Sequence, residues 1–447
     1  MSDEIERILE SSNLSTPELR EALREVTPQA LSDIWSGLEP EEAQRIFLAL
    51  DIEKKADLIS YLPDHEQEEI IIYLSEQTTR LLVEEMEPDD LVDLMQSVSH
   101  EVRRSVWESL SDKGKRETLF LLRFDEDDAA GLMTPRYSAV QQGLTVAGTI
   151  RFLKNKSAEA ETIYYVYVVD KLNRLKGVLS LRQLIMAADE TAVQDIMTTD
   201  LISVREDTDQ EEVAQILQAH ELIALPVLDE AGKLLGIVTF DDIMDVISDE
   251  HTEDVYRMGA MDGMADPYLS TPVLRLVRKR IPWLVLLLLL GTITTNVLHH
   301  YESIIINAAF LIIFLPVITQ TGGNAGGQSS TLMIRGLATG QIQFRDFRRI
   351  LWRELLVGLM LGLGTGVVIF LRSYFMPPGV EILPALAIGS ALIFVVFFAT
   401  IVGTLAPILI ARLGFDPTVM SSPLMATLID VAGITIFFET AIFILNL

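Results

Sequence analysis

The sequence predicts a multidomain protein: an acidic all-α N-terminal domain, an α/β repeat pair, a connecting helix and a five-helix α transmembrane domain. Charge distribution is the first reason, because the net charge of −29 lies wholly in the first 280 residues. The second is hydropathy, because apolar runs long enough to cross a bilayer begin after residue 280. Two internal repeats are the third. The expected domains are residues 1–130, 131–250, 251–280 and 281–447.

Residues 1–130 are expected to be helical throughout. A motif in which a proline is followed by acids recurs at 38–42, 62–66 and 86–90. Proline near the first helical position followed by acids marks a helix start, since the acids meet the positive end of the helix dipole. Apolar residues at helical spacing between these starts predict a solenoid-like stack of short helices. The clustered acids are either solvated first turns or cation ligands.

The composition restricts the partners and the chemistry. An acidic soluble half disfavours nucleic acid and anionic lipid as partners and favours cations, although acidity also serves solubility alone. The chain contains no cysteine, which excludes disulfides and thiolate metal sites. The first 30 residues are polar and contain no apolar stretch, so no signal peptide is expected.

Residues 131–250 contain the second internal repeat. The segment GLMTP at 131–135 matches DIMTT at 195–199, and each copy continues with two strand-like runs, at 165–169 and 177–180 and at 224–228 and 236–239. This pattern resembles a tandem pair of CBS domains. The resemblance implies binding of an adenine nucleotide such as ATP, with Thr239 toward phosphate and Asp242 toward ribose. The first copy has Gln183 at the position of Asp242, so at most one site is complete. A purely structural hinge or dimer contact is the alternative.

Five spans are expected in the membrane half, at about 281–298, 303–320, 351–372, 384–410 and 419–447. Basic residues gather before span one, between spans two and three, and between spans four and five. This distribution predicts a cytoplasmic N-terminal half and a C-terminus outside. Span two ends in TGGNAGGQSS at 321–330. As irregular backbone, this run must line a cavity or lie on protein. The alternative is an ordinary Gly-rich cytoplasmic loop.

Asp430 is a carboxylate inside the last apolar span. An aspartate at the centre of a membrane helix costs roughly 3 kcal/mol. A wholly helical path from Asp416 would place it about 20 Å along the chain. Pro423 is expected to introduce a kink or broken turn, which would reduce that depth. An intramembrane acid normally faces a water-filled path or a cation. The alternative is an acid satisfied by a neighbouring Ser, Thr or Arg within the bundle.

The domain order, together with GGNAG at 322–326 and PLMATLID at 423–430, resembles the MgtE family of magnesium channels over nearly the full length. The resemblance implies Mg²⁺ uptake by a homodimer in the lipid bilayer of the inner cell membrane, and no enzymatic activity. It also implies a pore on the two-fold axis, closed when the cytoplasmic half senses Mg²⁺. The implied metal-binding residues are Asp430, Ala426 beside it, Asp416 at the cytoplasmic mouth, and the interdomain acids Asp89, Asp90, Asp245, Glu250, Glu253 and Asp254. The family has an asparagine before the pore proline, where this chain has Ser422.

The chemistry of magnesium agrees with this assignment. Mg²⁺ dehydrates reluctantly and prefers hard oxygen ligands. One aspartate from each subunit of a two-fold dimer would place two negative charges opposite one dication. Transport of Mn²⁺ or Co²⁺ is an alternative, as is an intramembrane aspartyl hydrolase. The hydrolase would need two adjacent acids, whereas Glu439 follows Asp430 by nine residues.

Overall fold

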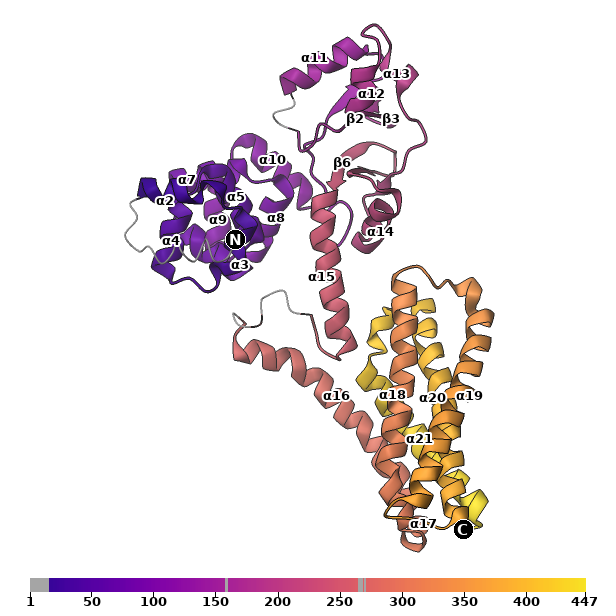
Figure 1. Cartoon of the computed structure of the whole chain (residues 1–447). Coiled ribbons are helices and arrows are strands. Elements are labelled where there is room, and N and C mark those ends of the chain that lie inside the picture. The colour runs from indigo at the N-terminus through magenta and orange to yellow at the C-terminus, as the bar shows by residue number, and fades with distance from the viewer. Residues whose placement is uncertain (1–15, 157–159, 264–267, 269–270) are drawn as a thin grey trace. The chain divides into compact units, whose positions relative to one another are not determined.

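The structure is a computed structural model that describes residues 16–156, 160–263, 268 and 271–447 (Figure 1). The described chain forms two compact units that divide after Glu250. Residues 1–15 of the expected helical domain, and residues 264–267 and 269–270 of the expected connecting region, lie outside the described residues.

Short helices follow one another through the N-terminal part of the first unit, as the sequence predicts. They are α2 (Thr16–Ala22), η1 (Leu23–Glu25), α3 (Pro28–Trp35), α4 (Pro40–Ala49), α5 (Ile52–Tyr61), α6 (Asp64–Tyr73), α7 (Glu76–Glu85), α8 (Pro88–Ser97), α9 (His100–Ser109) and α10 (Asp112–Leu121). Pro40 and Pro88 begin α4 and α8, and Pro63 is the N-cap of α6, so all three proline motifs are helix starts. Helix α3 packs on α5, α5 on α7 and α7 on α9, which forms one continuous core.

Two small sheets of identical topology follow. The first contains β1 (Ala139–Gln141), β2 (Tyr165–Val169) and β3 (Leu175–Ser180), with helices α11 (Val146–Lys156), α12 (Leu181–Met186) and α13 (Val193–Ile196). The second contains β4 (Val204–Arg205), β5 (Ala224–Leu228) and β6 (Leu234–Thr239), with α14 (Gln210–His220). In each sheet the central strand pairs parallel to the first strand and antiparallel to the third. The predicted α/β repeat pair is confirmed.

The two copies exchange their entry segments. The Met133 side chain, from the entry of the first copy, lies where a Cβ on Gly236 of the second copy would stand, 2.7 Å from Sδ. Met197 makes the reciprocal contact at Gly177, 2.4 Å from Sδ. Only glycine leaves room for either thioether, so these contacts explain a glycine at the same place in both third strands.

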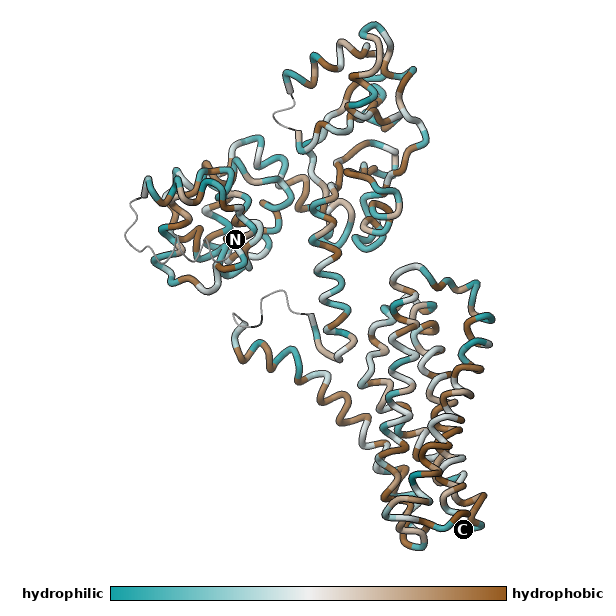
Figure 2. The backbone as a smooth tube through the Cα atoms, viewed as in Figure 1, coloured by the Kyte–Doolittle hydropathy of each residue, from teal (hydrophilic) through white to brown (hydrophobic). Residues whose placement is uncertain are grey.

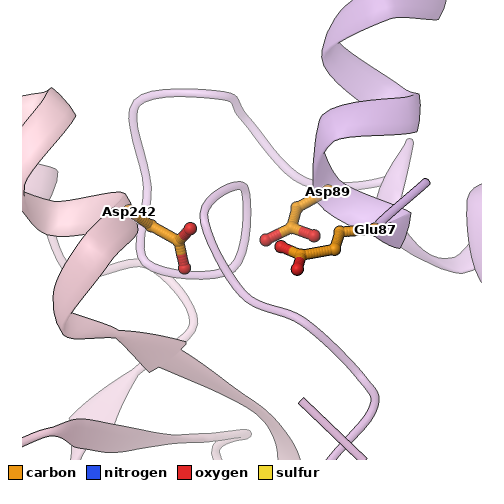
Figure 3. A group of neighbouring side chains, drawn as sticks. All are labelled: Glu87, Asp89 and Asp242. Carbon is orange, nitrogen blue, oxygen red and sulfur yellow. The ribbon is translucent and has the colours of Figure 1, made fainter. Parts of the chain in front are cut away.

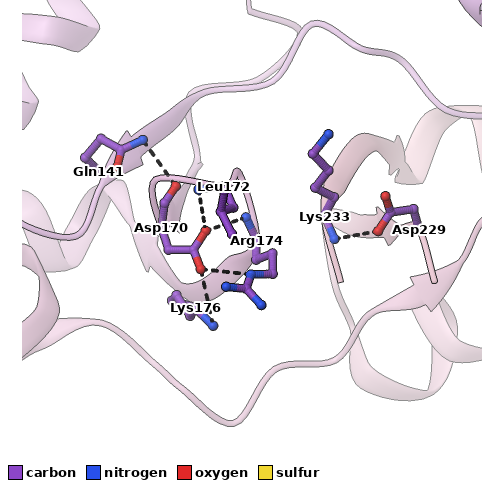
Figure 4. Close-up of polar contacts among 7 residues, drawn as sticks. All are labelled: Gln141, Asp170, Leu172, Arg174, Lys176, Asp229 and Lys233. Carbon is purple, nitrogen blue, oxygen red and sulfur yellow. Dashed lines mark hydrogen bonds and ion pairs between the residues drawn. The ribbon is translucent and has the colours of Figure 1, made fainter. Parts of the chain in front are cut away.

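The hairpin turns of the two copies repeat the same chemistry (Figure 4). Asp170 Oδ1 accepts hydrogen bonds from the backbone N–H groups of Leu172 and Arg174, at 2.8 and 3.0 Å. Asp229 Oδ1 accepts from the backbone N–H of Lys233 at 2.8 Å. A short acid that bonds its own following backbone stabilises a tight turn, so each acid fixes the register of its hairpin.

Helix α15 (Phe240–Met258) leads out of the second sheet, and the long helices follow. They are α16 (Val273–His300), α18 (Phe310–Ala338), α19 (Phe347–Phe375), α20 (Ile382–Arg412) and α21 (Ser422–Leu445), with the short α17 (Glu302–Asn307), η3 (Phe344–Asp346) and η4 (Pro417–Val419). Hydrophobic residues dominate these long helices (Figure 2). Within the second unit, α20 packs against α18, α19 and α21, and it contributes much of the buried core.

Four of the long helices are apolar and long enough to cross a membrane: Val273–His300, Phe344–Phe375, Ile382–Arg412 and Ser422–Leu445. Helix α18 has 29 residues, but the part that begins at Gln320 is rich in Gly, Ser, Gln and Asn, and we call this part its polar, glycine-rich half. The sequence predicts the second span at about 303–320. That prediction is wrong in its bounds, because the chain there divides into α17 and α18 and α18 continues to Ala338.

Two further expectations require correction. The run at 321–330 is regular helix within α18, neither irregular backbone nor a loop. Its glycines permit close helix packing, because a Cβ on Gly403 of α20 would lie 2.3 Å from the Gly326 carbonyl oxygen. Pro423 does not kink α21, because it occupies the first turn, where proline costs no hydrogen bond. Asp430 therefore lies about 12 Å from the helix start at Ser422.

Candidate functional site

The first turns of α21 pack directly on the glycine-rich half of α18. A Cβ placed on Gly323 would lie 3.2 Å from the Cβ of Ala426, and one on Gly327 would lie 2.7 Å from Ser422 Oγ. The Ser330 hydroxyl donates to the Met420 carbonyl at 2.9 Å, just before α21 begins. These contacts hold the segment that leads to Asp430 against the polar half of α18.

Asp430 itself is half-buried, while its neighbour Ile429 is completely buried against α18. On α18, three polar side chains at helical spacing are exposed in the single chain: Gln320, Asn324 and Gln328. Spacing by four residues places them on one face. A polar helix face and an intramembrane carboxylate both require water, an ion or protein around them, because lipid cannot satisfy them.

Asp416 lies in the connection between α20 and α21 and is bonded on both carboxylate oxygens. Its Oδ1 accepts from the backbone N–H of Thr418 at 2.8 Å, and its Oδ2 pairs with the Arg257 guanidinium. Arg257 also pairs with Glu253, one turn earlier on α15. All three residues belong to the second unit. Two expected cation ligands therefore share one arginine in this structure.

A cluster of three acids lies in the first unit, within the described residues (Figure 3). Glu87 and Asp89, at the start of α8, face Asp242, in the first turn of α15, and one oxygen of each lies within 4.8 Å of the others. Asp89 is only 7% exposed, and its Oδ1 has no hydrogen-bond partner among the residues described. Thr239 donates to Asp242 through both its hydroxyl and its backbone N–H. This is a donor set of hard oxygens such as Mg²⁺ prefers.

Burial and mutual repulsion raise the pKa of all three acids above the ordinary value of a carboxyl group. Burial raises the pKa of Asp242 to about 6. Burial, with the Glu161 charge beside it, raises the pKa of Glu87 to about 10. The pKa of Asp89 is raised well above its ordinary value by burial and by Asp242. A polar cavity of about 500 Å³ adjoins Glu87 and Glu161. Ionised acids in this arrangement lack a counter-charge, which a cation would supply.

Comparison with known proteins identifies the family. Residues 315–440 match the MgtE family model, described as a divalent cation transporter, residues 26–127 match the MgtE intracellular N domain, and residues 193–249 match a CBS domain. The chain is 42% identical over 429 residues to the magnesium transporter MgtE of Thermus thermophilus, with 95% of each chain covered. The chain belongs to the MgtE family. It is also 30% identical over 424 residues to the magnesium transporter MgtE of Bacillus subtilis, covering 95% of this chain and 93% of that one.

Two solved structures resemble the soluble part of this MgtE family member. One is the cytosolic domain of the Mg²⁺ channel MgtE in complex with ATP, 42% identical, with a TM-score of 0.52 and coverage of 55% of this chain and all of that one. The other is the soluble part of a magnesium transporter, 33% identical, with a TM-score of 0.51 and coverage of 56% and 98%.

The acids that the sequence groups as interdomain ligands occupy different places in this MgtE structure. Asp89 lies with Asp242, the residue expected at ribose. The Ser60 hydroxyl donates to Asp90 at 2.6 Å. Burial raises the pKa of Asp90, and Asp245 adds to that rise, so these two acids are electrostatic neighbours.

The remaining predicted ligands lie further along α15. Glu250 accepts a hydrogen bond from the Gln210 side chain at 2.5 Å. Glu253 pairs with Arg257, and Asp254 is half-buried. The structure thus divides the predicted set among the start of α8, the start of α15 and the end of α15.

Several residues of interest were not predicted from the sequence. Glu87 has a visible signal, since it precedes Pro88 in the third proline motif. Glu354 of α19 is a further acid inside a membrane helix, only 9% exposed, with Oε2 lying 3.3 Å from Thr404 Oγ1 and 3.5 Å from Ser329 Oγ. The Arg257 pairing had no local signal, because Asp416 is 159 residues away.

The raised pKa values predict a pH dependence of stability. The stabilising contribution of protonated Asp242 is fully present below its unfolded pKa of about 4 and is lost as pH rises through about 6. This loss is worth about 3 kcal/mol at 1.36 kcal/mol per unit. We expect the melting temperature of the Mg²⁺-free full-length protein to fall between pH 4 and 7, and Mg²⁺ to restore it at pH 7.

Asp242→Asn is the matched variant, because it keeps the side-chain shape without the ionisation. It should flatten the pH profile and reduce the effect of Mg²⁺. A wild-type profile in Asp242→Asn would exclude Asp242 as the source.

Proposed function

We propose that the protein conducts Mg²⁺ across the cell membrane through a path lined by α21 and the polar half of α18. The observation that carries this proposal is the half-buried Asp430 beside the glycine-rich packing of α18. Ala426 lies one turn before Asp430, which places both on the same side of α21. Such a path can hold Mg²⁺ with waters in place, because carboxylate and amide oxygens serve as outer-shell partners.

The path is proposed to form between two copies of the chain. The exposed face of Gln320, Asn324 and Gln328 supports a dimer, because it would be enclosed by a second copy rather than by lipid. A two-fold axis beside α21 would bring two copies of Asp430 together. With α18 as a fifth crossing helix, the C-terminus is proposed to lie outside and residues 1–280 inside.

We propose a separate role for each of the proposed domains. Residues 1–130 and 131–250 would sense cations, 251–280 would connect, and 281–447 would conduct, without enzymatic activity. Mn²⁺ or Co²⁺ is the second candidate cargo, since both also bind carboxylate oxygens. The identity to magnesium transporters favours Mg²⁺.

Removing the Asp430 charge tests the conduction proposal. We expect Asp430→Ala to abolish Mg²⁺ uptake, and Asp430→Asn to reduce it by at least about tenfold, since roughly 1.4 kcal/mol of lost cation stabilisation suffices for that factor. Uptake is measured with a fluorescent Mg²⁺ indicator in proteoliposomes.

Glu439→Gln is the matched control, because Glu439 is another acid of α21 and accepts a hydrogen bond from Tyr301 at 2.8 Å, which glutamine can also accept. It should transport at near the wild-type rate. Wild-type uptake by a folded Asp430→Ala protein would exclude Asp430 from the path.

Closure at high cytoplasmic Mg²⁺ is proposed to arise from the acids of the first unit and of α15. Their like charges repel, and a bridging dication would relieve that repulsion between α8 and α15. Moving a two-state gate from 1:99 to 99:1 requires about 5.5 kcal/mol of differential binding, which exceeds what one weakly held ion supplies. Asp89, Asp90, Asp245, Glu250, Glu253 and Asp254 are therefore proposed to share this work with Glu87 and Asp242.

Graded loss of inhibition is the expected signature. Asp89→Asn alone should raise the half-inhibitory Mg²⁺ concentration modestly, by about threefold, which is below 1 kcal/mol. The triple variant of Asp89, Asp242 and Asp245 to Asn should keep the channel open at millimolar Mg²⁺. The measurement is current in inside-out membrane patches against bath Mg²⁺.

A triple Gln variant of three exposed acids, Glu101, Glu190 and Glu212, removes the same charge elsewhere and should behave as wild type. Equal loss of inhibition in this control would reduce the mechanism to net charge alone.

ATP is proposed to bind the CBS pair with Thr239 and Asp242 as contacts, in line with the 42% identity to a cytosolic domain solved with ATP. Asp242 faces Glu87 and Asp89 in this structure, so a nucleotide would have to draw it away from them. We expect millimolar ATP to raise the melting temperature of the full-length protein by mass action. Asp242→Ala should abolish the rise, while Gln183→Ala, at the equivalent first-copy position, should keep it. No shift in the wild type would remove this proposal.

A further inference from the structure

Arg257 pairs with the carboxylate of Asp416, in the connection between α20 and α21. Its guanidinium pairs with Asp416 Oδ2 and with Glu253 Oε1, so one positive charge serves two carboxylates. Arginine suits this arrangement, since its planar group presents donors in two directions and stays ionised at all physiological pH values. The side chains of Arg257 and Asp416 are 40% and 33% exposed, so solvent and ions reach the pair.

The position of Asp416 is fixed by the chain around it. Asp416 caps η4 through the Thr418 N–H, and η4 leads within a few residues to the start of α21. Ser330 of α18 bonds the Met420 carbonyl in the same connection. A cation attached to Asp416 is therefore attached to the turn that begins the Asp430 helix.

The segment that follows Arg257 also makes hydrogen bonds with α16, within the second unit. The Trp283 indole N–H donates to Asp262 Oδ1 at 3.1 Å, and the Lys279 ammonium donates to the Gly263 carbonyl. Both donors belong to α16. The end of α15 is thus connected to the transmembrane helices on two sides, and Arg257 forms the connection to the α20–α21 turn.

Two acids share one guanidinium at this point, since Arg257 pairs with both Glu253 and Asp416. A divalent cation that binds both acids would compete with the guanidinium for these carboxylates. Affinity for an ion that must first displace an internal group is reduced by the fraction of time that the group is bound.

We propose that Arg257 is a built-in competitor of Mg²⁺ at the cytoplasmic end of the ion path. By occupying Asp416 and Glu253 it raises the cytoplasmic Mg²⁺ concentration that closes the pore. This inference rests on the proposed function, since it takes Asp416 and Glu253 as acids that Mg²⁺ reaches. It goes beyond that function in assigning the setting of the threshold to a positively charged residue of α15.

Replacing Arg257 tests the proposal in the full-length protein. Arg257→Gln frees both acids, so the Mg²⁺ concentration for half-inhibition in inside-out patches should fall by about fivefold, the lower end of coupling between two sites. Arg257→Lys keeps the positive charge but loses the double contact. Its half-inhibitory Mg²⁺ concentration should therefore fall only slightly, to within about twofold of the wild-type value. Arg278→Gln, an exposed arginine of α16, removes the same charge and should leave the threshold unchanged.

A double-mutant cycle separates competition from a general effect on folding. If Arg257 acts through Asp416 and Glu253, the effect of Arg257→Gln should disappear in a background that carries both Asp416→Asn and Glu253→Gln, because no acid remains for Mg²⁺ to gain there. Equal shifts in both backgrounds would overturn the proposal, as would a rise in the threshold, which would make the ion pair itself a closing contact.

The same patches distinguish failure of the proposed function from failure of the role of Arg257. If wild-type patches carry no Mg²⁺ current, the proposed function fails. If they carry current that Mg²⁺ inhibits, and Arg257→Gln leaves the threshold unchanged, only the role of Arg257 fails.

Discussion

An ionised carboxylate cannot remain in hydrocarbon without water, a cation or a proton, and much of the second unit follows from the need to accommodate Asp430. Its helix, α21, begins at Ser422, so the acid lies in the third turn and not deep in the bundle. The adjacent α18 replaces apolar side chains with glycine at the contacts and with amides on the exposed face. The glycines permit close packing, and the amides supply polar surface at the level of the acid. Both features lower the mean hydropathy of α18. Four other long helices in the described part of the chain are apolar enough to cross a membrane, and α18 is not among them.

The acidic residues outside the membrane helices fall into two groups that differ in how their charge is balanced. Some have a basic partner in the chain: Asp170 has Arg174, and Asp416 has Arg257. Glu87, Asp89 and Asp242 have mainly one another, and burial makes their repulsion costly. A protein free to optimise stability alone would separate such acids or supply a lysine. Their retention is understandable if a cation is the intended partner, since the repulsion then becomes the free energy that binding recovers.

Sequence reasoning succeeded where the signal is local. The proline motifs mark helix starts because dipole and steric preferences act within one turn, and the strands of the repeat pair follow from short alternating apolar runs. It failed at 321–330, where glycine predicts irregular backbone in water but permits close helix packing in a bundle. It also failed where partners are distant in the chain. The face that Asp242 presents to Asp89, and the pairing of Arg257 with Asp416, depend on tertiary packing that no spacing rule encodes. Glu354 was overlooked because a single acid in an apolar run carries no sign of the hydroxyls on other helices that surround it.

The geometry of α15 relates the two groups of acids. Asp242 lies in its first turn and Arg257 in its last turn. In the first turn, repelling acids would gain a cation, whereas in the last turn a guanidinium would compete with one. On this view the placement of acids in the first turn and a cation in the last does more than complement the helix dipole: it gives the two ends opposite responses to the same ion.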